Sequence, residues 1–260
     1  VTVFLEGNVR DGSNLVIKAK TSYQGKDTGS VEANGAWRKV SFSIPLTELH
    51  LWEPLNGRLY DLETTLYDNN NVLDVVESYF GMRSVSLTDK AILINGKPVF
   101  QRLILDQGFY MDGIYTAPSD DELRKDIERS IVMGFNGARL HQKVFEPRFL
   151  YWADRLGYLC WGEHANWGLD ISNPEGMMAF LPEWVEILQR DFSHPSIVGW
   201  CPFNETQGNQ DPRILEYIYK VTREIDPTRP IIDTSGWVHT KYTDVFDIHD
   251  YDQDVESLAR

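Results

Sequence analysis

Residues 196–205 read SIVGWCPFNE, an almost unbroken apolar run that closes on an amide and a carboxylate. A strand that is apolar on both faces is typical of a parallel sheet covered by helices. A carboxylate directly after such a run needs a reason, and burial beside aromatic rings would raise the pKa of Glu205 toward the range of a general acid. We therefore treat Glu205 as a candidate catalytic acid, against the alternative of a solvated or helix-capping residue.

Strand-like and helix-like segments alternate on both sides of this run, from about residue 88 onward. The other strands are expected at 99–106, 135–141, 158–164, 230–235 and 244–251. The helices carry start signals at Ser119, Pro147, Asp211 and Pro212, and stop signals at Gly134 and Gly157. The helix after residue 164 is expected to bury Leu181, Val185, Leu188 and Phe192. Such alternation predicts a parallel sheet with helices packed on it.

Polar side chains gather where these strands are expected to end. They are Asp106, Gln107, Arg139, His141, Glu163, His164, Asn204, Glu205, Asp233, His249, Asp250 and Tyr251. The carboxyl ends of successive parallel strands form the catalytic face of a (β/α)8 barrel, so this distribution favours a barrel. A doubly wound sheet is the competing architecture, but neither GxGxxG nor GxxxxGK follows the first strand.

The first part of the chain, up to about residue 87, has a different pattern. Strands are expected at 15–23, 37–45, 59–68 and 72–85, with turns at residues 11–14 and 68–71. Period-2 alternation interrupted by Gly and Asn clusters is typical of a β-sandwich. The sequence therefore predicts a multi-domain chain: a β-sandwich over residues 1–87, then an incomplete TIM barrel over residues 88–260 that contains strands one to six.

The composition excludes several classes of partner. The chain has 25 basic and 39 acidic residues, a net charge of −14, which disfavours nucleic acid and anionic membranes as partners. Cys160 and Cys201 are the only cysteines, without CxxC or His-rich spacing, so we expect buried reduced thiols, no metal and no cofactor. No run approaches the length of a membrane span. A cytoplasmic location is expected, with an upstream signal for secretion or the periplasm left open.

Several motifs, in this order, resemble glycoside hydrolase family 2, the family of β-galactosidases, β-glucuronidases and β-mannosidases. They are LWEPLNGRLYDLETTLYD at 51–68, FGMRSV at 80–85, NGKPVF at 95–100, GFNGARLH at 134–141, FNE at 203–205 and DPTRP at 226–230. The first two are similar to the family's immunoglobulin-like domain leading into its barrel. The resemblance implies hydrolysis of O-glycosidic bonds at terminal β-linked sugars by a retaining double displacement.

The resemblance also implies roles for individual residues. Glu205 would be the acid/base and Asn204 the sugar-binding amide beside it, while Arg139 would support the nucleophile and Tyr251 would touch it. The further candidates for substrate binding are Asp106, Gln107, His141 and Glu163 for sugar hydroxyls, and Trp167 and Trp237 for stacking. Each of these six has a scaffold or core role as its alternative. Residues 102–107 and 139–142 depart from the usual family motifs, so the sugar is left unassigned.

The nucleophile is expected outside this chain. In the family it lies on the seventh strand, whereas the sequence ends at Arg260, just after the expected sixth. The fragment alone is therefore expected to be inactive, and either to associate through an open strand edge, for instance as a homo-oligomer, or to be only the ordered part of a longer polypeptide. Glu163 is on a strand adjacent to that of Glu205, which does not suit a retaining pair. An inactive carbohydrate-binding or scaffolding protein is the alternative; a metal-dependent hydrolase would need a His-x-His motif that the first strand lacks.

Overall fold

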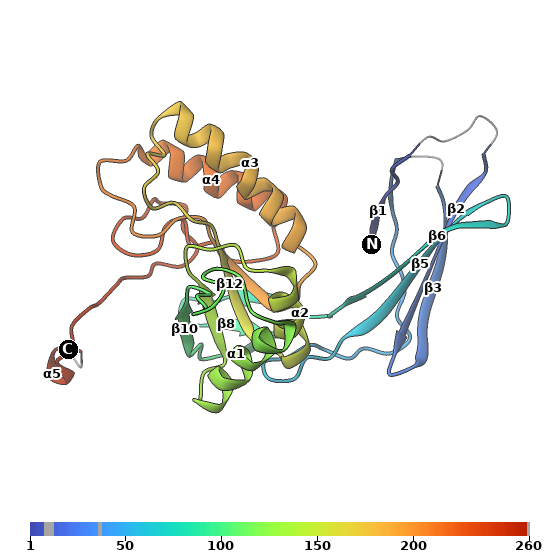
Figure 1. The fold of residues 1–260 in the computed structure, drawn as a ribbon, viewed down its shortest axis with the longest axis horizontal. Helices are drawn as coiled ribbons and strands as arrows, with labels where there is room; N and C mark the ends of the chain where they lie inside the picture. The colour runs from blue at the N-terminus through green and yellow to red at the C-terminus, as the bar shows by residue number, and fades with distance from the viewer. Residues whose placement is uncertain (8–12, 36–37, 259–260) are drawn as a thin grey trace. The chain divides into compact units, whose positions relative to one another are not determined.

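The computed structural model describes residues 1–7, 13–35 and 38–258. It divides into two compact units, the first made of Val1–Trp52 and Arg58–Met82, the second of Glu53–Gly57 and Arg83–Arg260 (Figure 1). The short segment Glu53–Gly57 belongs to the second unit, where Leu55 N donates to Gly157 O at 2.7 Å. The change in sequence pattern expected near residue 87 thus lies close to a change of unit.

The first unit is built from antiparallel strands. A four-stranded sheet has the order β3-β2-β5-β6, and β1 pairs with β4 in a two-stranded sheet. The bounds are Thr2–Phe4 for β1, Leu15–Tyr23 for β2, Lys26–Asn34 for β3, Lys39–Ser41 for β4, Tyr60–Asp68 for β5 and Asn71–Phe80 for β6. Its core includes Ile17, Trp52 and Tyr60, each with no exposed surface.

Two tight hairpin turns fix the register of this sheet. Asn69 and Asn70, between β5 and β6, both have positive φ, as a type I′ turn requires. Gln24 and Gly25 do the same between β2 and β3. The turn at Asn69 and Asn70 was expected from the sequence. Strand β3 was not expected, because its residues are mostly polar. Residues 11, 12 and 37, which were expected in a turn and at a strand start, lie outside the described residues.

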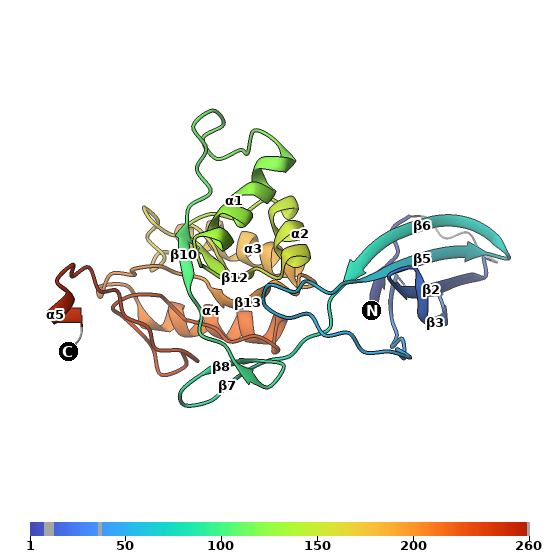
Figure 2. The ribbon, with the colours of Figure 1, turned by 90° about the horizontal axis from the view of Figure 1, so that it is seen from below.

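The second unit contains a parallel sheet in the sequential order β10-β11-β12-β13. These strands span Leu103–Asp106, Gly137–Leu140, Leu159–Glu163 and Ile197–Cys201. The helices are α1 at Asp120–Val132, α2 at Pro147–Leu156, α3 at Pro174–Asp191, α4 at Pro212–Ile225 and the short α5 at Val255–Leu258. A small antiparallel sheet precedes them, formed by β7 at Val85–Leu87, β8 at Ile92–Ile94 and β9 at Lys97–Pro98. Helices α1 and α2 lie side by side in both views (Figures 1 and 2).

The fifth and sixth expected strands differ from the prediction. Residues 230–235 run parallel to β13 and its extension but pair only through the bridges Trp200–Ile231 and Asn204–Ser235. Residues 244–251 form no strand. The reason is local: Asp244 and Asp247 side chains accept hydrogen bonds from the backbone N–H groups of Ile231 and Gly236, at 2.7 and 3.4 Å. Backbone donors that a ladder would use are thereby bound to side chains.

Helix caps follow the sequence signals. Ser119 accepts from Glu122 N at 3.2 Å and Asp211 accepts from Arg213 N at 2.9 Å, while Gly157 closes α2 with φ 71°. The buried face of α3 was predicted correctly at Leu188, whereas Leu181 and Val185 are only partly buried. The structure buries Phe180, Trp184, Ile187, Leu188 and Asp191, and Phe192 is 40% exposed. The fully buried Trp184, whose Nε1 donates to Thr222 Oγ1 at 2.8 Å, sets this face.

Two glycines in the central strands leave room for the indole ring of a tryptophan on the neighbouring strand. A Cβ on Gly199 would lie 2.3 Å from Trp161 Cζ3, and one on Gly162 would lie 2.4 Å from Trp200 Cζ3. Neither ring can easily move, since Trp161 Nε1 donates to Gln101 and Trp200 Nε1 to Asp226, at 2.8 and 2.7 Å.

We expect Gly199→Ala to destabilise the protein by about 1–3 kcal/mol through overpacking against Trp161. The matched control is Gly208→Ala, where an added Cβ would meet no atom within 4 Å. The measurement is a urea titration of both variants. Equal stability of the two variants would contradict the packing argument.

Candidate active site

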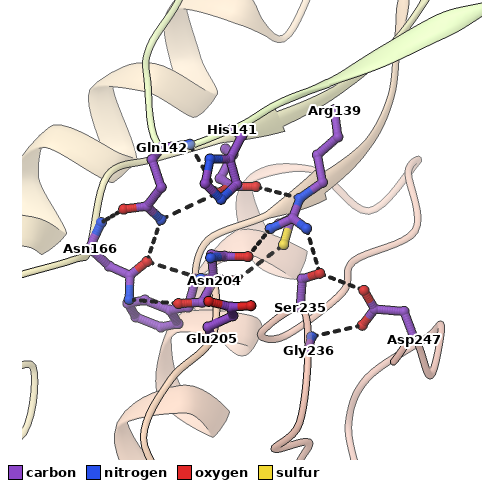
Figure 3. Close-up of polar contacts among 12 residues, drawn as sticks. Arg139, His141, Gln142, Asn166, Asn204, Glu205, Ser235, Gly236 and Asp247 are labelled. Atoms are coloured by element: carbon purple, nitrogen blue, oxygen red, sulfur yellow. Dashed lines mark hydrogen bonds and ion pairs between the residues drawn. The ribbon is translucent and has the colours of Figure 1, made fainter. Parts of the chain in front are cut away.

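Arg139 is the centre of the polar network at the strand ends (Figure 3). Its Nε donates to Glu163 Oε2 at 2.7 Å, its Nη2 to Asn204 Oδ1 at 2.5 Å and its Nη1 to Ser235 Oγ at 2.7 Å. These partners come from β12, from the residues after β13, and from the fifth strand position. A rigid guanidinium fork thus fixes three strand ends relative to one another.

The amide of Asn204 is held rigidly, with one donor left over. Asn204 has no exposed surface, its backbone N donates to Asn166 Oδ1 at 2.9 Å, and its O accepts from Asn166 Nδ2 and Trp167 Nε1. Within the described part of the chain, Asn204 Nδ2 has no hydrogen-bond partner. A buried amide donor without a partner is costly, so its presence points to an acceptor supplied by a ligand.

The Glu205 carboxylate is bound by two side chains of the 244–251 segment. Its Oε1 accepts hydrogen bonds from Tyr251 Oη and from His249 Nδ1, the latter at 2.7 Å. The backbone of Glu205 is in the left-handed region, with φ 47°, which is uncommon for a residue other than glycine. Such strain is often found at functional sites, where the surrounding structure over-determines the conformation.

The pKa of Glu205 is shifted in the direction opposite to the one expected from the sequence. Partial burial raises this pKa, but hydrogen bonds from Tyr251 and His249, with the nearby His249 and His141 charges, outweigh burial and lower it. The donors were not foreseen because they come from residues 44 and 46 positions further along the chain. A general acid at this position would need negative charge nearby to raise its pKa again.

Glu163 is a support for the network. It is buried, and burial raises its pKa while Arg139 lowers it in part. Its Oε1 accepts from Gln142 N and Nε2, at 3.0 and 3.3 Å, and Oε2 accepts from Arg139. Gln142 in turn bonds to Asn166 Oδ1 at 2.7 Å. Both carboxylate oxygens are therefore occupied by the chain itself.

Asp106, Gln107 and His141 lie at the ends of β10 and β11. Gln107 Nε2 is 3.0 Å from His141 Nδ1, and Asp106 Oδ1 accepts from Gly108 N at 2.8 Å. Burial and the charge of Arg139 lower the pKa of His141 to about 4. His141 is therefore neutral at physiological pH, and the Gln107 contact assigns its proton to Nε2. The side chain of Gln107 is exposed.

The two tryptophans proposed for stacking are more than half exposed. Trp167 contacts His141 edge to face at 5.2 Å between ring centroids, and Trp237 contacts His249 in the same way at 6.2 Å. Their exposed fractions are 56% and 59%. Large rings in contact with site residues are suited to the apolar face of a sugar, and this role remains a prediction.

Two strand-end residues have other tasks. His164 packs against Phe180 and Trp184 of α3, and its Nε2 pairs with Glu183 at 3.1 Å. Asp233 binds His239 Nδ1 and the N–H groups of Thr234 and Thr240 at 2.6–2.8 Å.

Cys160 and Cys201 are buried free thiols, and burial raises the pKa of both.

Sequence reasoning missed part of the network. The residues not proposed were Gln142, Asn166, Ser235, Asp247 and His249. His249 was among the polar residues expected at strand ends but was given no role in the site, and Ser235 closes the expected strand at 230–235, so the strand-end rule points to both. Gln142, Asn166 and Asp247 carry no such signal, because they lie in loops whose path is set by tertiary contacts.

Residues 1–7, 13–35 and 38–258 lack two other features that could indicate a function. In these ranges, no group of three or more His, Cys, Asp and Glu side chains is arranged as a metal site. Among the same residues, no helix is long and apolar enough to cross a membrane.

The fold and the site define a TIM-type barrel with a carboxylate and an amide at the end of its fourth strand. The sequence matches the family described as Glycosyl hydrolases family 2 over residues 1–83, and its TIM barrel domain over residues 85–257. The second match alone covers more than half of the chain. This chain therefore belongs to glycosyl hydrolases family 2, with an immunoglobulin-like sandwich followed by an incomplete TIM barrel, as the sequence motifs indicated.

Known proteins of this family are moderately similar. The chain is 27% identical over 207 residues to a β-glucuronidase from Streptococcus agalactiae, covering 72% of this chain and 34% of that protein. It is 26% identical over 226 residues to a β-galactosidase from Vibrio vulnificus, covering 83% and 21%. A solved β-glucuronidase from Ruminococcus gnavus has a TM-score of 0.76 at 22% identity, covering 88% of this chain and 39% of that chain. The chain thus spans 21–39% of the length of these relatives.

Proposed function

We propose that the protein containing this chain hydrolyses terminal β-glycosidic bonds with net retention, and that Glu205 is its acid/base. The observation that carries the proposal is the pair at the end of β13. Asn204 has a buried amide N–H without a partner among the described residues, directly beside the Glu205 carboxyl. A donor fixed by Arg139 and Asn166 is suited to a sugar hydroxyl next to the bond that Glu205 would protonate.

In this proposal Glu205 acts twice. Protonated, it gives its proton to the glycosidic oxygen as a carboxylate nucleophile attacks the anomeric carbon and the aglycone leaves. As the carboxylate, it then takes a proton from water, whose oxygen displaces the nucleophile from the anomeric carbon. The negative charge of that nucleophile would raise the pKa of Glu205 in the free enzyme, and it falls again once the charge is consumed in the covalent intermediate.

We propose that the nucleophile comes from outside residues 1–260. Glu163 is the buried carboxylate of β12, and it is already bound to Arg139 and Gln142. Its oxygens serve the scaffold, and its strand is adjacent to that of Glu205. The relatives named as β-glucuronidases and β-galactosidases support a terminal β-linked sugar as substrate.

The stereochemical outcome tests this mechanism. The full-length protein is incubated with a panel of nitrophenyl β-glycosides, and the first-formed sugar is followed by ¹H NMR before mutarotation. We expect the β anomer first, because two inversions give net retention. The matched nitrophenyl α-glycosides are the control and should not be cleaved. An α anomer formed first from a β-glycoside would contradict the double displacement.

A further inference from the structure

His249 connects Glu205 to the Arg139 network. Its Nδ1 is 2.7 Å from Glu205 Oε1, while its Nε2 is 2.8 Å from Ser235 Oγ and 3.2 Å from Arg139 Nη1. The side chain of His249 is only 15% exposed. Every polar atom of this ring therefore contacts a residue of the site.

The neighbours of Nε2 determine which ring nitrogen carries the proton. Arg139 can only donate, so its Nη1 favours an Nε2 that accepts. Ser235 Oγ donates its one proton to Asp247 Oδ2 at 2.5 Å and so offers no donor to Nε2, whereas the Glu205 carboxylate can only accept from Nδ1 at 2.7 Å. The ring proton is thus on Nδ1, where it is donated to Glu205.

The other charged and titratable groups around Glu205 act through different contacts. Tyr251, from the same segment as His249, donates to the same Oε1 atom. His141, on the residues after β11, affects Glu205 through charge alone and is neutral above a pH of about 4. Arg139 and Asp247 reach Glu205 only through His249 and Ser235. His249 is consequently the one described side chain that both touches Glu205 and is oriented by the network.

We propose that His249 is a positioning residue, which orients the Glu205 carboxyl for proton transfer and is itself oriented by Arg139 and Ser235 at Nε2. This role rests on the proposed acid/base function of Glu205. If His249 has this role, the segment formed by residues 244–251 contributes to general acid catalysis and does not serve the fold alone. Arg139 contributes through this ring and, separately, through its hydrogen bond to Asn204.

Two amide substitutions separate the two sides of the ring. In His249→Asn, Nδ2 takes the place of Nδ1 and keeps a donor toward Glu205. In His249→Gln, the longer amide reaches the Nε2 side and leaves Glu205 without that donor. Misplacing a catalytic group can cost about 100-fold in rate, so kcat/KM for alkyl β-glycosides should fall about 100-fold in His249→Gln and less than about 10-fold in His249→Asn.

The pH profile gives a readout that a structural role would not move. The donor at Nδ1 stabilises the Glu205 carboxylate, so its loss raises the pKa of the acid. The alkaline limb of kcat/KM should therefore move to higher pH in His249→Gln and stay in place in His249→Asn. Thermal midpoints of both variants are measured to confirm folding. Asp247→Asn, which lets the Ser235 hydroxyl donate to His249 Nε2, is a second variant and should leave this limb in place, because Nδ1 keeps its proton.

The outcomes distinguish this proposal from the function on which it rests. Equal losses in the Asn and Gln variants, with no movement of the alkaline limb in His249→Gln, would overturn the positioning role. If Glu205→Gln itself leaves alkyl β-glycosides unaffected, the acid/base assignment fails instead. Rescue by Asn together with a shifted limb in Gln supports the proposal.

Discussion

In the full-length protein, Glu205→Gln is expected to lower kcat/KM for alkyl β-glycosides by about 10²- to 10⁴-fold. Alkoxide leaving groups need a proton from the enzyme, and an amide cannot supply it. The substitution keeps the size of the side chain, and the amide oxygen can still accept from Tyr251 Oη. A loss of rate would therefore report missing proton transfer and not a collapsed site. The measurement is initial-rate kinetics with alkyl and nitrophenyl β-glycosides in parallel.

Activated aryl glycosides should respond differently. Their leaving groups depart without a proton, so the glycosyl-enzyme should still form and appear as a burst of nitrophenol. Its hydrolysis should then be slow, because water has lost its general base. Glu175→Gln, an exposed carboxylate on the first turn of α3, is the matched control and should leave both substrate classes unchanged. Equal losses for alkyl and aryl substrates in Glu205→Gln would mean that Glu205 does not transfer the proton.

The scaffold of the site could be predicted from the sequence because it depends on local signals. The apolar run at 196–205 predicted β13 and the position of Asn204 and Glu205 at its end. Caps at Ser119 and Asp211 and the stop at Gly157 predicted helix ends to within a residue or two, since each satisfies backbone groups nearby. The family motifs then supplied the fold class, which the comparisons confirmed.

The hydrogen-bond network of the site could not be predicted in the same way. Contacts between Arg139, Ser235 and His249 join residues 96 and 110 positions apart, and hydrophobic periodicity contains no information on such pairs. The 244–251 segment reads as a strand, yet Asp244 and Asp247 bind its neighbour's backbone and prevent a ladder. The lowered pKa of Glu205 follows from the same contacts. It was therefore invisible to an argument from burial alone.

Arg139→Met is expected to reduce the free energy of unfolding by about 3–5 kcal/mol. The guanidinium is the cation that pairs with Glu163, whose side chain has no exposed surface. Its removal would leave that carboxylate buried without a charge partner, and it would also free Asn204 Oδ1 and Ser235 Oγ. The measurement is a urea titration of the full-length variant against the unmodified protein.

The double variant Arg139→Met/Glu163→Gln separates stability from activity. Neutralising Glu163 removes the unpaired charge, so much of the stability lost in the single variant should return. Activity should not return, because Asn204 and the His249 ring would still lack the donor that orients them. A double variant that recovers both stability and turnover would show that Arg139 acts only as a counter-ion. One that recovers neither would place its main contribution in the hydrogen bonds to Asn204 and Ser235 and not in the ion pair.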